Sequence, residues 1–289
     1  MTNAYSMEFN EQPGTLGAYL KALKPGSRLQ EGESIPRIEA TLHQVDTDPG
    51  KLQKYRQVCG FSDSDRLPAT FPHILASPLH MHVMTSKAFP LRLLGLVHVR
   101  NRIVQHRPVK VQEPIDVHVW VQGHRDVHNG VEFDMTTELR DKTGKVAWEE
   151  TSTMLSRGKG KGEKPSRKPA SEALEFGRYA SFSAPSNIGR RYGMVSGDVN
   201  PIHISAVSAR LFGFPRAIAH GMWLLARCAA EVEEEYLGDS FELTVAFRQP
   251  VLLPSEVIMK YSQNDDGLDY QLTRADGAKT HLGGCIRSL

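Results

Sequence analysis

The sequence predicts an α+β fold built from two related units, each an antiparallel sheet that curves around one apolar helix. The first observation is an internal repeat, in which the Tyr, Val and Gly of Tyr55–Gly60 recur at the same positions of Tyr192–Gly197. Further matches follow in the same order, which favours two related units over chance agreement. They are Phe71-Pro72 with Phe214-Pro215, Met81 with Met222, and Arg107 with Arg248. The second observation is a predicted helix, His220–Glu235, that is apolar on most sides and therefore needs a sheet to cover it.

The first unit is expected to begin with a strand, Ser34–Val45, followed by a short helix after Pro49, since proline suits the first helical turn. A markedly apolar helix is expected at Ile74–Thr85. Four runs of strand-like alternation come next, separated by turn signals such as Asn129-Gly130. These strands are Leu94–Gln105, Ile115–Gln122, Val131–Leu139 and Lys145–Leu155.

The second unit repeats this order with a strand at Arg178–Ser183, a helix after Pro185, and the apolar helix His220–Glu235. Turn signals at Asp265–Gly267 and Asp276-Gly277 separate the strands that complete the unit. These strands are Glu242–Phe247, Glu256–Gln263, Leu268–Arg274 and His281–Ile286.

The charge distribution suggests where one unit ends and the other begins. The chain of 289 residues has a net charge of +2, and Arg157–Lys168 alone holds six basic residues and one acidic residue. The predicted organisation is an N-terminal unit at 1–156, a basic linker at 157–171 and a C-terminal unit at 172–289. Because the basic excess lies in the linker, no folded face is expected to bind nucleic acid.

Composition also indicates the environment. No apolar run approaches the length that spans a bilayer, and Met1–Gln30 lacks the apolar segment of a signal peptide. The three cysteines, Cys59, Cys228 and Cys285, have neither zinc spacing nor a disulfide pattern. We therefore expect a protein of the cytoplasm.

The segment from Asp198 to His203 is the strongest candidate for chemistry. On a helix these two side chains would point apart, but Asn200-Pro201 breaks the helix between them, so the chain must turn. A turn brings carboxylate and imidazole to one point, where they can hold a water and exchange protons near neutral pH. The alternative is an Asp that caps a helix beside a packed His.

Gly221 is a candidate oxyanion donor, because the first turn of a helix has unpaired N–H groups and glycine admits a close substrate. The alternative role is close helix packing. His220 is interpreted as structural rather than catalytic.

Tyr-x3-Ser-Gly-Asp-x-Asn-Pro-x-His followed by Ala-His-Gly-Met, over Tyr192–Met222, resembles the hydratase signature of the MaoC-like family. These are hot-dog-fold (R)-specific enoyl-thioester hydratases and 3-hydroxyacyl-thioester dehydratases. With the repeat, the chain looks like a double-hot-dog protein. The resemblance implies catalytic Asp198 and His203, an oxyanion donor at Gly221, and (R) stereochemistry. A serine of some relatives would fall at Ala229 and is absent.

The first half departs from this signature. The loop between Gly60 and Phe71 is shorter than its counterpart and contains neither acid nor histidine at the matching places, and His80 replaces the glycine before Met81. The first half is therefore expected to be catalytically silent and, as in double-hot-dog relatives, to accommodate the acyl chain. Candidates to line that space, with core packing as the alternative, are Phe71, Leu75, Leu79, Met81, Val83 and Met84.

The predicted activity is reversible hydration of trans-2-enoyl thioesters of coenzyme A or acyl-carrier protein. Asn200, Met222 and Arg248 are predicted to bind substrate, Arg248 through a phosphate of the carrier arm, although it also suits a surface strand. Water addition needs no redox cofactor, and His80-Met81-His82 lacks a third metal ligand, so neither cofactor nor metal is expected. The alternatives are an acyl-thioester-binding protein without activity and a hot-dog thioesterase. Monomer and homodimer are both compatible with the sequence.

Overall fold

The computed structural model describes residues 5–15, 17–18, 29–163 and 175–289. The chain divides into two compact units. The first contains Met1–Asp46, Leu75–Asn101 and Pro114–Leu174, and the second contains Thr47–Ile74, Arg102–Glu113 and Glu175–Leu289. Short segments of the N-terminal half thus pack with the C-terminal half. Of the linker proposed at 157–171, residues 164–171 lie outside the described residues.

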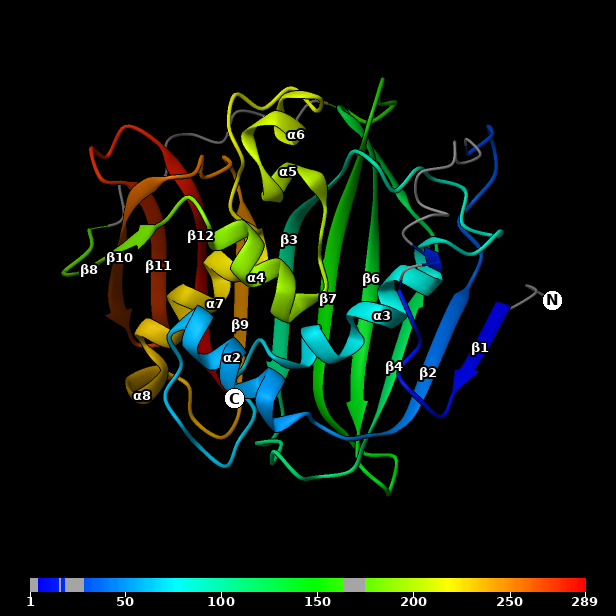
Figure 1. The fold of residues 1–289 in the computed structure, drawn as a ribbon, viewed down its shortest axis with the longest axis horizontal. Coiled ribbons are helices and arrows are strands. Elements are labelled where there is room, and N and C mark those ends of the chain that lie inside the picture. Colours follow the sequence, from blue (N-terminus) through cyan, green and yellow to red (C-terminus); the bar gives the residue numbers. More distant parts are fainter. Residues whose placement is uncertain (1–4, 16, 19–28, 164–174) are drawn as a thin grey trace. The chain divides into compact units, whose positions relative to one another are not determined.

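The first unit is a sheet that packs against one helix (Figure 1). Its strand order is β1-β2-β4-β6-β7-β3, with β5 paired to β6. β1 runs parallel to β2, while β2, β4, β6 and β7 pair antiparallel along this order. The strands are β1 (Tyr5–Phe9), β2 (Ile38–Val45), β3 (Leu96–Gln105), β4 (Ile115–Val121), β5 (Arg125–Val127), β6 (Gly130–Arg140) and β7 (Val146–Arg157).

Alternation along these strands explains the packing of the sheet. Every second residue of β4 is buried, and its register places Val119 opposite Ala40 on one side and Thr137 on the other. Successive side chains of a strand point to opposite faces, so one face is buried under the apolar helix α3 (Pro72–Met84).

The second unit repeats the pattern with strand order β9-β12-β11-β10-β8, all neighbours antiparallel. The strands are β8 (Arg178–Ala184), β9 (Phe241–Phe247), β10 (Ser255–Asn264), β11 (Gly267–Arg274) and β12 (Thr280–Ser288). Helix α7 (Gly221–Glu231) is buried on most sides, including Leu225 and Ala226, neither of which is measurably exposed. A helix with so little polar surface is stable only when it is covered, as the sequence indicated.

Two helices of the second unit carry the repeat and end alike. α2 (Pro49–Cys59) and α4 (Ile188–Ser196) are each terminated by a left-handed glycine, Gly60 at φ 83° and Gly197 at φ 77°. Glycine adopts this conformation without a Cβ penalty, which is why it recurs at helix ends. The repeated tyrosines of the two helices face each other, with ring centroids 6.2 Å apart.

α7 is tied to the end of α2 by two side chains. The indole of Trp223 donates a 3.0 Å hydrogen bond to Val58 O, and the Arg227 guanidinium donates one of 2.9 Å to Cys59 O. These carbonyls belong to the last turn of α2, where no intrahelical donor reaches them. The pairing fixes the direction of the helix that begins at Gly221.

All predicted strands are present, with ends shifted by up to four residues, and β1 and β5 were not predicted. The single helix predicted at His220–Glu235 is wrong in one respect, because it breaks at Val232 (φ −123°), and α8 (Glu233–Tyr236) follows. Two short helices, α5 (Pro201–Ile204) and α6 (Ala206–Arg210), lie between α4 and α7. In the described part of the chain, no helix has both the length and the apolar character needed to traverse a bilayer.

Candidate active site

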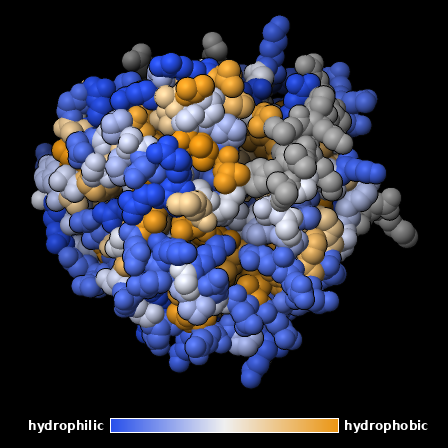
Figure 2. Space-filling view, viewed as in Figure 1, coloured by the Kyte–Doolittle hydropathy of each residue, from blue (hydrophilic) through white to orange (hydrophobic). Residues whose placement is uncertain are grey.

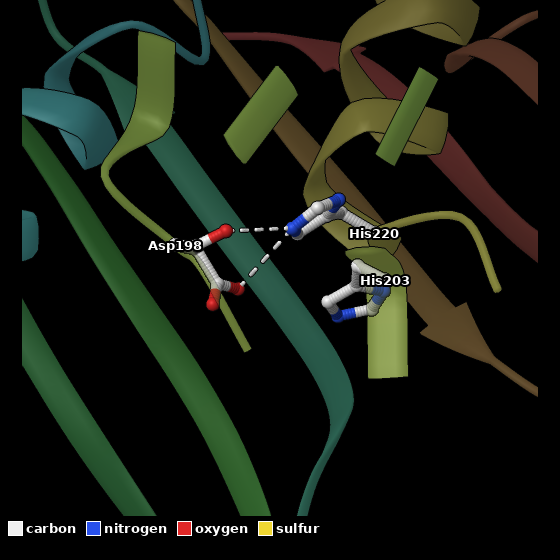
Figure 3. A group of neighbouring side chains, drawn as sticks. All are labelled: Asp198, His203 and His220. Carbon is white, nitrogen blue, oxygen red and sulfur yellow. Dashed lines mark hydrogen bonds and ion pairs between the residues drawn. The ribbon is translucent and has the colours of Figure 1, made fainter. Parts of the chain in front are cut away.

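Three polar side chains of the second unit meet at one point (Figure 3). Asp198 follows α4, His203 lies in α5, and His220 immediately precedes α7. One ligand-type atom of each lies within 4.8 Å of those of the other two. The turn predicted between Asp198 and His203 therefore brings these side chains together.

The local sequence explains this turn. Gly197 ends α4, and Ser196 Oγ then accepts a 3.1 Å hydrogen bond from the Asp198 backbone N–H. The Asp198 carboxylate accepts a 3.1 Å bond from Asn200 N–H, so its side chain folds back over the turn. Asn200 in turn caps α5, accepting from Ile202 N–H at 3.4 Å, and Pro201 occupies the first helical position.

His203 presents an unprotonated nitrogen to the site. Its Nδ1 donates a 2.8 Å hydrogen bond to the carbonyl of Ile218, which assigns the proton to Nδ1 and leaves Nε2 as an acceptor. Burial lowers the pKa of this imidazole below 6.5, although the nearby Asp198 carboxylate and the Ile218 carbonyl oppose the shift. His203 is therefore neutral near pH 7.

His220 supports both of the other residues. Its Nε2 donates a 3.1 Å bond to the backbone carbonyl of Asp198 and lies 3.7 Å from that residue's carboxylate, as the dashed lines in Figure 3 show. Its ring stacks on that of His203, with centroids 3.6 Å apart. Burial, and then proximity to His203, lower its pKa to about 3. The sequence indicated only a structural role for His220. Its contact with Asp198 could not be predicted, because the separation of the two residues in the sequence does not indicate it.

Asp198 is the member of the cluster that solvent reaches. Its side chain is 47% exposed, whereas His203 and His220 are 8% and 3% exposed. Partial burial tends to raise the pKa of its carboxyl group, but His220, His203 and the Asn200 N–H together outweigh burial and hold the pKa below 3.8. The group is a carboxylate at neutral pH.

The cluster therefore offers two proton acceptors, the Asp198 carboxylate and His203 Nε2, at a place that solvent can reach. A carboxylate and a bare imidazole nitrogen can orient one water and remove its proton. The same three groups are also the ligand types of a divalent ion. However, the planes of the stacked rings are only 24° apart, so their in-plane lone pairs cannot converge on an ion at metal–nitrogen distances of about 2.0–2.1 Å.

Gly221 opens α7 beside the cluster. In the described chain its N–H has no hydrogen-bond acceptor, as expected for the first residue of a helix. A Cβ built at this glycine would lie 3.1 Å from the ring of Phe247, so the site is already close-packed. Met222 beside it is buried at 6% exposure.

Arg248 lies outside this group. It follows β9 and is exposed, and its backbone N–H donates a 2.8 Å bond to His281 O. Within residues 175–289 and the other described ranges, its guanidinium has no hydrogen bond or ion pair. The structure gives it no contact with Asp198 or His203.

The first unit shows no comparable cluster among its described residues. His80 Nε2 pairs with Thr137 Oγ1 at 2.8 Å, whereas His82 Nε2 donates to the Gly14 carbonyl at 3.1 Å, so the two imidazoles serve different partners. Of the six residues suggested to line an acyl space, Phe71, Leu75, Leu79 and Val83 are buried, and Met81 and Met84 are half-buried.

Comparison with known proteins gives the family. A family model described as a MaoC like domain matches residues 175–280. The chain is 32% identical over 266 residues to 3-hydroxyacyl-thioester dehydratase X of Mycobacterium tuberculosis, covering 89% of this chain and 91% of that protein.

Solved structures agree with the fold. The crystal structure of HtdX from Mycobacterium tuberculosis aligns with a TM-score of 0.76 and 31% identity, over 87% of this chain and 100% of that one. A MaoC-like dehydratase of Phytophthora capsici aligns with a TM-score of 0.71 at 17% identity, over 88% of this chain and 95% of that one. A protein of Mycobacterium tuberculosis described as having a double hotdog fold aligns with a TM-score of 0.54 at 12% identity, over 90% of this chain and 96% of that one. The α+β architecture of two sheet-and-helix units is thus a double hot-dog fold. The chain belongs to the MaoC-like dehydratase family and is an enzyme of the hydro-lyase class.

Proposed function

We propose that this enzyme catalyses reversible hydration of trans-2-enoyl thioesters to (R)-3-hydroxyacyl thioesters. The observation that carries the proposal is that the Asp198 carboxylate and the imidazole of His203, whose Nε2 carries no proton, meet beside Gly221, whose N–H has no acceptor in the described chain. The similarity to 3-hydroxyacyl-thioester dehydratase X supports the substrate class. The stereochemistry rests on the family alone.

In this mechanism Gly221 N–H binds the thioester oxygen and stabilises the enolate character that develops there. Asp198 and His203 hold one water at C3; its oxygen bonds to C3 as one of its protons passes to the pair, and the pair returns one proton to C2, so that it ends in its starting protonation state. Removing one oxyanion donor typically lowers the rate about 10²–10³-fold. Asn200 maintains the turn, and Met222 contacts the acyl group. No electrons are transferred, so the reaction needs no redox cofactor.

The rest of the chain has supporting roles in this proposal. Residues 172–289 form the catalytic unit, residues 1–156 the silent unit that accommodates the acyl chain, and 157–171 the link between them. Arg248 is proposed to meet a phosphate of the pantetheine carrier, because it is exposed and follows Phe247, whose ring lies against Gly221.

The test is loss of the enoyl-thioester absorbance with crotonyl-, octenoyl- and dodecenoyl-CoA, with identification of the product. Asp198→Asn and His203→Ala should each lower kcat by at least about 100-fold while the fold is retained. Asp63→Asn and His128→Ala are matched controls, because both residues are exposed and lie outside the cluster. They should leave kcat unchanged.

Two results would contradict the proposal. Release of free thiol without 3-hydroxyacyl product would indicate a thioesterase. Tight acyl-CoA binding without turnover at any chain length would indicate a binding protein.

A further inference from the structure

The segment that carries the catalytic turn also exposes an unusual amount of apolar surface. Nine large apolar side chains are exposed in the described part of the chain, and five of them fall within residues 194–212. They are Met194, Val199, Val207, Leu211 and Phe212, and Leu211 reaches 82% exposure. Single exposed apolar side chains are ordinary, whereas a concentration of them on one segment is typical of interaction sites.

The same segment is strongly basic. Residues 188–216, called the loop surface below, contain four arginines and a single acid, the site residue Asp198. The arginines are Arg190, Arg191, Arg210 and Arg216, and all are exposed. Where their side chains make hydrogen bonds, the acceptors are backbone carbonyls: Ile204 O at 3.1 Å, Pro215 O at 3.4 Å and Pro254 O at 3.4 Å. A carbonyl does not neutralise a guanidinium, so the loop surface keeps its positive charge.

The loop surface is one packed part of the second unit. α4 contacts α5 and α5 contacts α6, and the hydrogen bond from Arg190 to Ile204 joins α4 to the end of α5. Figure 2 shows hydrophobic atoms exposed among hydrophilic ones in the region where Figure 1 places α5 and α6. Asp198 lies within this surface and is the exposed member of the cluster, so solvent reaches the site from the loop surface.

We propose that the loop surface docks an acidic acyl-carrier protein that delivers the enoyl thioester to Asp198 and His203. This inference rests on the proposed hydratase activity. Arginines that form no ion pair with any described residue complement an acidic partner and steer its approach, while the exposed apolar side chains supply the contact that holds a folded protein. Coenzyme A offers phosphates to arginines but no apolar face of matching size, so the five apolar side chains favour a protein carrier.

The experiment compares crotonyl-acyl-carrier protein with crotonyl-CoA for the intact enzyme and two variants. The first is Arg191→Glu with Arg210→Glu, and the second is Leu211→Ser. Each variant should raise KM for the carrier-protein substrate by about tenfold and leave kcat and KM for crotonyl-CoA within about twofold. The control is Lys279→Glu, a single charge reversal and so half the change of the double variant, at an exposed residue between β11 and β12.

A direct binding measurement distinguishes failure of the docking proposal from failure of the proposed hydratase activity. Fluorescently labelled acyl-carrier protein is titrated with enzyme, and the two variants should weaken its binding by about tenfold even if no hydration occurs. Activity on crotonyl-CoA with no carrier-protein binding would overturn the docking proposal alone. Absence of turnover with either substrate would contradict the hydratase.

Three further results would overturn the docking proposal. Equal losses on both substrates would show that the arginines bind the phosphates of the pantetheine arm. Sedimentation of the enzyme with anionic vesicles, lost in Leu211→Ser while carrier-protein kinetics stay unchanged, would assign the surface to lipid. A dimer that dissociates in Leu211→Ser would assign it to a second copy of the chain.

Discussion

His220→Phe should separate positioning of the catalytic pair from stability of the fold. His220 touches the pair in two ways: Nε2 donates to the Asp198 carbonyl at 3.1 Å, and its ring stacks 3.6 Å from that of His203. Phenylalanine keeps an aromatic ring for the stack and removes the donor. The substitution therefore removes the polar contacts of His220 with Asp198 and keeps the ring stack.

The expected effect on stability is small because two terms offset each other. Loss of the donor leaves the Asp198 carbonyl short of one partner, which costs about 1–3 kcal/mol. His220 Nδ1, however, is buried without a hydrogen-bond partner among the described residues, and phenylalanine removes that similar cost. The free energy of unfolding should stay within about 1 kcal/mol of that of the unchanged protein.

The expected effect on catalysis is larger. The hydrogen bond holds the backbone of Asp198 and so sets where its carboxylate lies relative to His203. If about 1.4 kcal/mol of that alignment is lost in the transition state, kcat falls about tenfold. Because the change affects the transition state more than substrate binding, KM should change little.

The assay pairs crotonyl-CoA hydration with urea unfolding of the same variant. His220→Asn is the complementary variant, since it keeps a donor and loses the ring. An unchanged kcat in His220→Phe would refute the positioning role. A fall in kcat matched by several kcal/mol of destabilisation would show that His220 acts through the fold.

Three more outcomes are expected. Because the pKa values of His203 and His220 are lowered, their contribution to stability is complete above pH 6.5 and is lost as pH falls toward the lowered values. Urea unfolding at pH 7 and pH 5 measures this loss. The acid limb of kcat/KM should also lie below pH 6.5. Gly221→Ala keeps the N–H but places a methyl 3.1 Å from the Phe247 ring, which should displace the donor and lower kcat by about 10²-fold, and adding Phe247→Leu should restore part of it; an unchanged kcat would show that close packing against Phe247 does not position the donor. Arg227→Met removes a hydrogen bond to an α2 carbonyl and a contact over an aromatic ring at 4.9 Å, and should lower the free energy of unfolding by about 2–3 kcal/mol in a urea titration.

The architecture was predictable because short-range rules control it. Period-two alternation and Asp/Asn-Gly turns gave the antiparallel strands, and the apolar helix implied the sheet that covers it. β1 escaped prediction because it is only five residues long and pairs in parallel with β2, a pairing that no hairpin turn signal can announce. The break at Val232 has no proline or glycine to signal it.

The site was predictable only in part. Asn200-Pro201 forces the turn, and a turn is sufficient to expect that Asp198 and His203 meet. The protonation pattern was not predictable, because backbone carbonyls determine it: Ile218 O takes the Nδ1 proton of His203, and Asp198 O takes the Nε2 proton of His220. Which carbonyl accepts each proton depends on the path of the backbone, and every residue has a carbonyl, so the residue types do not reveal these partners.

The histidines of the site depend on backbone carbonyls for their hydrogen bonds, and this explains why the first half of the chain lacks both the catalytic loop and the histidine that corresponds to His220. In the repeat, Met81 corresponds to Met222, so Leu79 and His80 stand where the second half has His220 and Gly221. His220 donates its proton to the catalytic loop itself, so a half without that loop would bury an imidazole with no acceptor, at a cost of about 1–3 kcal/mol. Leu79 is fully buried, and its side chain has no polar atom, so it needs no hydrogen-bond acceptor from a catalytic loop that the first half lacks. Restoring only the Asp-x-Asn-Pro-x-His loop between Gly60 and Phe71 is therefore not expected to create a second active site.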